Sequence, residues 1–124
     1  MPRVIGPIAH GIIDYAIVIM LAAGPSVAGF RGRLAVFAYL IAFALFALTA
    51  LTRFPLGISK RVGFPVHGAI ELLIALLMIA LPFLANFAAG VNSRNFFIAA
   101  GVLIAIIWVL TDYRGRRERV AGRA

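Results

Sequence analysis

Residues 10–14 read His-Gly-Ile-Ile-Asp, and residues 67–71, 57 positions later, read His-Gly-Ala-Ile-Glu. Each copy places a histidine and a carboxylate four residues apart, which puts both side chains on one face of a helix. The chain has two histidines and four acidic residues, so the two copies take both histidines and half of the acids. Because ionisable side chains are costly inside apolar segments, this duplication predicts helices that gather the four side chains into one polar layer.

The remainder of the chain is strongly apolar. Of its 124 residues, 64% are hydrophobic and 13% are charged, and the mean hydropathy is +1.06, whereas soluble domains are about 45–50% apolar and about 25% charged. A chain of this length cannot bury so much apolar surface against itself. We therefore expect residues 1–124 to form a single integral membrane domain. The absence of cysteine from the sequence excludes disulfides and thiolate ligands.

Four apolar runs are long enough to cross a bilayer, which takes roughly 20 residues per helix. They cover approximately residues 7–24, 33–54, 64–84 and 94–113. The connections between them are short, so consecutive helices should be antiparallel neighbours. The predicted fold is an all-α membrane protein, a bundle of four transmembrane helices.

The two halves of the sequence align with each other as an internal repeat, repeat one over about residues 3–57 and repeat two over about residues 60–116. Each repeat is predicted to be one helical hairpin, and the two hairpins should be related by an axis along the membrane normal. The second helices of the two hairpins end in Thr52-Arg53 and Thr111-Asp112. These four residues should join the histidines and carboxylates in the polar layer.

The distribution of basic residues predicts the orientation in the membrane. Nine of the twelve lie at the N-terminus, between the second and third helices, or in the basic C-terminal tail over residues 114–124, and the other three are Arg31, Arg33 and Arg94. This bias predicts a multi-pass protein of the inner (plasma) membrane of a bacterium, with both termini and the polar layer on the cytoplasmic side. The expected partners of its surface are membrane lipids rather than nucleic acid.

The segments that follow the first and third helices share the pattern Pro-x-x-Ala-x-Phe, at residues 25–30 and 82–87. Together with the layout of two hairpins, this pattern resembles the SPW-repeat family of small bacterial membrane proteins, although the Ser-Pro-Trp triplet itself is absent from both segments. The resemblance implies a four-span bundle and carries no assigned chemistry.

The polar layer is open to four interpretations. It can be structural, with His10 bonded to Glu71 and His67 bonded to Asp14 across the bundle. It can bind a divalent metal, since His10, Asp14, His67 and Glu71 supply two nitrogens and two oxygens that suit zinc, iron or manganese. It can hold haem between His10 and His67 as axial ligands. It can also handle protons or small ions, but residues 16–23 and 73–81 offer no polar group for a path across the membrane.

The sequence contains no nucleophile elbow, phosphate loop or dinucleotide fingerprint, so we do not expect an enzyme. The leading interpretation is an accessory or scaffold subunit of a membrane complex, with a polar pocket near its cytoplasmic side. Such a protein would meet other membrane-protein subunits, or further copies of itself, through its lipid-facing helices. The alternatives are a metal- or haem-binding membrane protein and a protein that handles protons or small ions.

Overall fold

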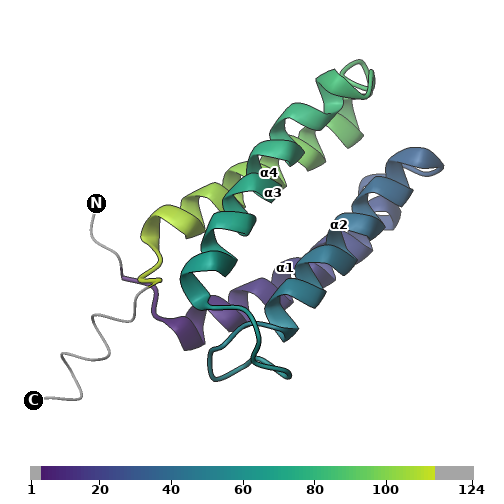
Figure 1. Cartoon of the computed structure of the whole chain (residues 1–124). Helices are drawn as coiled ribbons and strands as arrows, with labels where there is room; N and C mark the ends of the chain where they lie inside the picture. The colour runs from purple at the N-terminus through teal and green to yellow at the C-terminus, as the bar shows by residue number, and fades with distance from the viewer. Residues whose placement is uncertain (1–3, 114–124) are drawn as a thin grey trace, which may run out of the picture.

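The computed structural model describes residues 4–113, and the fold of this part of the chain is all-helical, as predicted. The helices are α1 (Pro7–Ala28), α2 (Arg33–Ala50), α3 (Phe64–Leu84) and α4 (Val91–Leu110) (Figure 1). Each of them is long and apolar enough to cross a membrane. At a rise of about 1.5 Å per residue, helices of 18 to 22 residues are about 27–33 Å long, which matches the thickness of a bilayer's hydrocarbon core.

The helices form two hairpins, α1–α2 and α3–α4, that lie side by side. Most helix–helix contacts are made within each hairpin, while α1 also contacts α4 and α2 also contacts α3. The α1–α2 and α3–α4 turns lie at one end of the bundle, and the α2–α3 loop and both ends of the described chain lie at the other (Figure 1). Helices α1 and α3, which carry the two histidines, therefore occupy diagonal positions.

Helices α1 and α3 begin in the same way. Each follows a glycine, Gly6 or Gly63, and carries a proline in its first turn, where the missing N–H costs no hydrogen bond. The His10 N–H donates to the Gly6 carbonyl and the His67 N–H to the Gly63 carbonyl, both at 2.9 Å. The two histidines consequently sit at the same depth, one turn inside their helices.

The first hairpin turn comes later in the chain than the sequence predicted. Helix α1 continues through Pro25 to Ala28, because a proline so close to the helix end removes only one hydrogen bond. The helix ends at Gly29, whose φ of 77° is left-handed, and the Phe30 N–H donates to the Pro25 carbonyl at 3.0 Å. The second hairpin has a corresponding bond, from the Phe87 N–H to the Pro82 carbonyl at 2.8 Å.

Helix α2 ends at Ala50 instead of residue 54, and α4 covers Val91–Leu110 instead of residues 94–113. The chain leaves α2 early because Thr52 pairs in parallel with Val62, just before α3. Thr111 pairs in the same way with Ile5, just before α1. These two short bridges bring the residue after α2 to the start of α3, and the residue after α4 to the start of α1.

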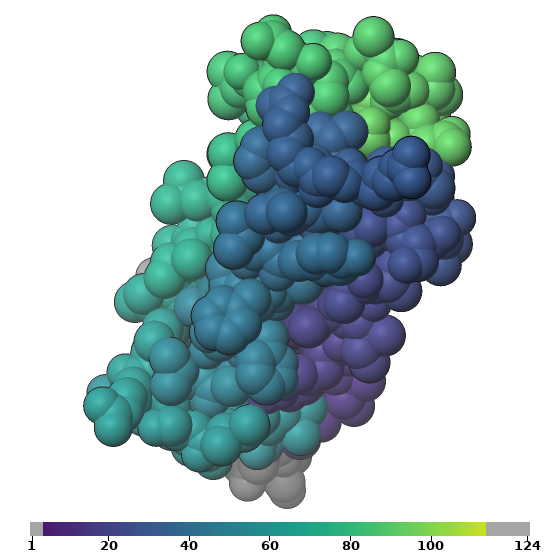
Figure 2. Space-filling model, turned by 90° about the vertical axis from the view of Figure 1, so that its right-hand side faces the viewer, coloured from purple at the N-terminus to yellow at the C-terminus, as the bar shows by residue number. Residues whose placement is uncertain are grey.

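The interior between the hairpins is filled by apolar side chains. Leu21, Leu45, Met78, Phe97 and Ile104 are fully buried and belong to one continuous cluster contributed by all four helices. Large apolar side chains such as Ile19, Phe43 and Leu73 point outward and are more than half exposed. Figure 2 shows the face on which α2 lies in front, with the α3–α4 turn at the top and the α2–α3 loop at the bottom.

Candidate functional site: a His/carboxylate cluster

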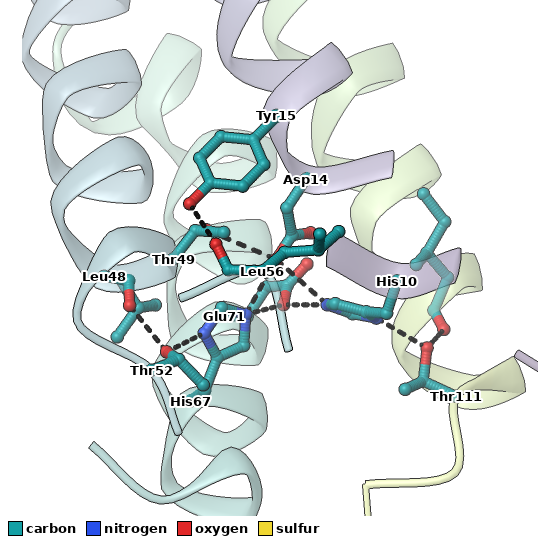
Figure 3. A network of polar contacts seen from close by, with 11 residues as sticks. His10, Asp14, Tyr15, Leu48, Thr49, Thr52, Leu56, His67, Glu71 and Thr111 are labelled. Carbon is teal, nitrogen blue, oxygen red and sulfur yellow. Dashed lines mark hydrogen bonds and ion pairs between the residues drawn. The ribbon is translucent and has the colours of Figure 1, made fainter. Parts of the chain in front are cut away.

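The two histidines and the two carboxylates of the repeated motif meet between the helices, near the end of the bundle that holds the α2–α3 loop. His10 and Asp14 extend from α1, and His67 and Glu71 extend from α3 (Figure 3). All four side chains are completely buried, and one nitrogen or oxygen from each of them lies within 4.8 Å of the other three. The i, i+4 spacing of each pair and the equal depth of the two helices explain this convergence.

Each histidine contacts both carboxylates through its Nε2 atom. His10 Nε2 lies 2.8 Å from Glu71 Oε2 and 3.1 Å from Asp14 Oδ2. His67 Nε2 lies 2.8 Å from Asp14 Oδ2 and 2.9 Å from Glu71 Oε2. Nitrogen and oxygen thus alternate around a closed ring of four atoms. The two expected contacts across the bundle, His10–Glu71 and His67–Asp14, are both present.

The other ring nitrogen of each histidine contacts a threonine. His10 Nδ1 lies 2.8 Å from Thr111 Oγ1, and His67 Nδ1 lies 2.7 Å from Thr52 Oγ1. Thr52 and Thr111 are fully buried, immediately beyond the ends of α2 and α4. Each imidazole is therefore held at both nitrogens, with Nδ1 directed to a hydroxyl and Nε2 directed to the carboxylates.

The carboxylates retain unused acceptor capacity. Asp14 Oδ2 accepts a further hydrogen bond from the Thr49 hydroxyl, at 3.3 Å. The second oxygens, Asp14 Oδ1 and Glu71 Oε1, are buried and accept no hydrogen bond from the residues that the structure describes. Buried carboxylate oxygens are normally satisfied, so these two atoms identify the cluster as a place where a cation would gain ligands.

Aromatic side chains cover the cluster at the end of the bundle that holds the α2–α3 loop. Phe54, Phe64 and Tyr113 are buried together in a small apolar group. The centroid of the His10 ring lies 5.3 Å from those of both Phe64 and Tyr113, and the His67 ring lies 5.7 Å from Phe64. This group separates the cluster from the solvent side and lowers the local dielectric, which strengthens electrostatic interactions inside.

The sequence predicted the central residues of the site and missed some of its surroundings. The structure gathers all four proposed metal ligands with Thr52 and Thr111. The Arg53 side chain is exposed instead of joining the layer. Asp112 is buried but lies outside the group of four candidate ligands.

Thr49, Phe54, Phe64 and Tyr113 also border the cluster, a role that was not predicted for them from the sequence. The one available signal for Thr49 is its position three residues before Thr52, which puts both hydroxyls on one face of the helix predicted over residues 33–54. For the aromatic residues, the signal is their location directly after α2, at the start of α3 and after α4.

The donor set fits a divalent metal ion and leaves no space for haem. Two imidazole nitrogens and two carboxylate oxygens form a competent set of ligands for a first-row transition metal. The centroids of the two imidazole rings are 5.4 Å apart, and the same carboxylate oxygens lie against both Nε2 atoms, so a porphyrin cannot be inserted between the histidines. The stretches over residues 16–23 and 73–81, which lead from the cluster toward the other end of the bundle, are entirely apolar and offer no polar side chain for an ion path.

Comparisons with known proteins add no family or relative. No protein-family model, no curated protein and no solved structure matches this chain. The geometry of the cluster is therefore the basis for any statement about its function.

Proposed function

We propose that this protein is a four-helix integral membrane protein that binds one divalent transition-metal ion through His10, Asp14, His67 and Glu71. The observation that carries the proposal is the closed ring of two Nε2 and two carboxylate oxygen atoms, in which every nitrogen lies within 3.1 Å of both oxygens. Ligands that already point at one another need little rearrangement to enclose an ion.

Charge balance supports a divalent cation in particular. Two ionised carboxylates in a fully buried cluster carry two negative charges, and burying uncompensated charge is costly. An ion of charge +2, bound by neutral imidazoles, makes the cluster neutral. The two carboxylate oxygens without hydrogen-bond partners, Asp14 Oδ1 and Glu71 Oε1, are available for additional coordination or for a bound water.

The membrane setting of this proposal follows from the lengths and composition of the helices and from the placement of the basic residues. We propose insertion into a bacterial inner membrane as two repeated hairpins, with both termini cytoplasmic and the cluster nearer that side. Matching hydrogen bonds support the repeat, since the Arg53 N–H donates to the Val62 carbonyl and the Asp112 N–H donates to the Ile5 carbonyl. The similarity to the SPW-repeat family remains part of this proposal.

Elemental analysis of the purified protein tests metal binding directly. Wild-type protein isolated without chelators should retain a transition metal at about one ion per chain, as expected for a four-ligand site. His10→Ala and His67→Ala should each abolish this content while the helical circular-dichroism signal persists, because lipid-embedded helices satisfy their own backbone hydrogen bonds. Asn92→Ala, at the exposed start of α4, is the matched control and should retain the metal. A metal-free wild type would contradict the proposal.

The second candidate function is an accessory or scaffold subunit of a membrane complex, or a homo-oligomer. The observation in its favour is that the short bonds His10–Glu71, His67–Asp14, His10–Thr111 and His67–Thr52 all join one hairpin to the other. In that case the cluster serves to pair the hairpins, and histidine substitutions should lower stability modestly, by about 0.6 kcal/mol per interhelical bond, without changing any bound species.

A further inference from the structure

The hydroxyl groups of Thr52 and Thr111 each have one proton to donate. In each case the acceptor is a backbone carbonyl oxygen, which cannot itself donate. Thr52 Oγ1 donates to the Leu48 carbonyl (Figure 3), and Thr111 Oγ1 donates to the Ile107 carbonyl, both at 2.6 Å. These carbonyls belong to the last turns of α2 and α4 and lack a helical partner. Since a hydroxyl has a single proton, neither threonine can donate to an imidazole as well.

The direction of the histidine–threonine bonds follows from this. At 2.7 and 2.8 Å, His67 Nδ1 and His10 Nδ1 are within hydrogen-bond distance of hydroxyl oxygens that can only accept. Each Nδ1 must therefore carry the proton. A neutral imidazole protonated at Nδ1 has its lone pair on Nε2, which is the atom directed at the carboxylates.

Each threonine bonds the histidine of the other hairpin. Thr52 follows α2 and bonds the histidine of α3, while Thr111 follows α4 and bonds the histidine of α1. Each threonine is also paired through its backbone with the segment that precedes its histidine's helix, Thr52 with Val62 and Thr111 with Ile5. The orientation of each imidazole thus depends on the docking of the other hairpin.

We propose that Thr52 and Thr111 are positioning residues that hold each histidine in the Nδ1–H tautomer, so that the two Nε2 lone pairs face a bound divalent cation. This inference rests on the proposed metal-binding function and adds the groups that prepare the site. Groups that bond the outer nitrogen of a ligating histidine raise its basicity and fix its ring, and their loss typically weakens metal binding 10–100-fold.

Zn²⁺ titrations of the full-length protein in lipid nanodiscs, with a competing chelator, test the inference. Thr52→Val and Thr111→Val keep the side-chain shape and remove the hydroxyl, and each should weaken Zn²⁺ binding about 10–100-fold. Thr52→Ser and Thr111→Ser restore a hydroxyl that can accept from Nδ1 and donate to the helix carbonyl. Each serine variant should therefore bind Zn²⁺ within a few-fold of the wild type.

Histidine ¹⁵N NMR spectra of the metal-free protein report whether Nδ1 carries a proton, independently of the affinity for Zn²⁺. The wild type should show Nδ1–H at both histidines, and each valine variant should lose this preference at the histidine facing the missing hydroxyl. Ser26→Ala is the control for the spectrum, because Ser26 is exposed near the α1–α2 turn, at the end of the bundle away from the cluster, and it should leave both histidines unchanged.

The outcomes separate the two proposals. A wild type that binds Zn²⁺, together with valine variants that keep both its affinity and its tautomers, overturns the positioning role and leaves the metal site intact. Serine variants as weak as the valine variants would also contradict that role, since they retain the hydroxyl. A wild type that takes up no Zn²⁺ overturns the proposed function and, with it, the role of the threonines in metal binding.

Discussion

Tyr113 lies with its ring over Gly68, in the space that a side chain at position 68 would need. A Cβ atom built there would be 2.8 Å from the ring Cε1 atom of Tyr113. The corresponding glycine of α1, Gly11, is covered in the same way by the ring of Phe54. The glycine that follows each histidine therefore makes room for an aromatic ring that covers the His/carboxylate cluster. It does not serve to bring two helix backbones into contact.

Gly68→Ala should destabilise the protein by about 1–3 kcal/mol, the usual cost of overpacking a well-filled site. The new methyl group would displace the Tyr113 ring, which packs against Phe64 with their centroids 4.9 Å apart. Unfolding of the purified protein in mild detergent gives the change in free energy. The same substitution made in a Tyr113→Ala background should cost much less, because the ring that it meets is gone. Equal costs in the two backgrounds would contradict this packing relationship.

Features that leave a local pattern in the sequence were predicted correctly, and features that depend on contacts between distant segments were not. Apolar length and i, i+4 spacing are local properties, and they predicted both the four helices and the meeting of His10 and Asp14 with His67 and Glu71. The ends of the helices were predicted less well. Pro25 was expected to lie in the loop but lies inside α1, since a proline near the end of a helix removes only one backbone hydrogen bond.

The position of Arg53 shows a second limit. Its alignment with Asp112 placed both residues in the polar layer, but α2 ends at Ala50, and the bridge between Thr52 and Val62 leaves the Arg53 side chain exposed. At the bridge the Thr52 side chain is buried and the Arg53 side chain is exposed. Such pairing is a tertiary contact and leaves no local pattern in the sequence.

Tyr15→Phe should loosen the α2–α3 loop. The Tyr15 hydroxyl donates to the Leu56 carbonyl at 2.9 Å, and loss of one such bond costs about 0.5–1.5 kcal/mol. We expect faster amide hydrogen exchange over residues 56–62 and little change in the centres of the helices. Tyr39→Phe, on the exposed face of α2, removes a hydroxyl of the same type and is the matched control. Unchanged exchange in the loop would show that Tyr15 does not hold it.

The distribution of basic residues predicts the orientation in the membrane, and single cysteines can test it because the natural sequence has none. Ser26 and Asn92 are exposed at the turn end of the bundle, whereas Ser59 lies in the α2–α3 loop at the other end. Cysteines at positions 26 and 92 should react with a membrane-impermeant maleimide in intact cells, and a cysteine at position 59 should react only after the cells are opened. The reverse pattern would place the termini and the His/carboxylate cluster on the outer side.

Uptake of a divalent cation should release protons from the cluster. Each histidine Nε2 lies 2.8–3.1 Å from two carboxylate oxygens, and a nitrogen and an oxygen at this separation share a proton. The Nδ1 protons are already bonded to the threonines, so the cation-free cluster holds its additional protons between Nε2 and the carboxylates. A divalent ion carries the charge of two protons. Replacing two protons by one such ion therefore keeps the buried cluster neutral.

We therefore expect release of about two protons per Zn²⁺ bound, and an affinity that falls as the pH is lowered, because protons and the cation compete for the same atoms. Calorimetric titration in buffers of different ionisation enthalpy measures the number released. Asp14→Asn removes one of the two negative charges and cannot hold a proton in its place, so this variant should release one proton fewer and bind Zn²⁺ more weakly. Binding to the wild type without proton release, or with an affinity independent of pH, would mean that Zn²⁺ is held outside the ring formed by His10, Asp14, His67 and Glu71.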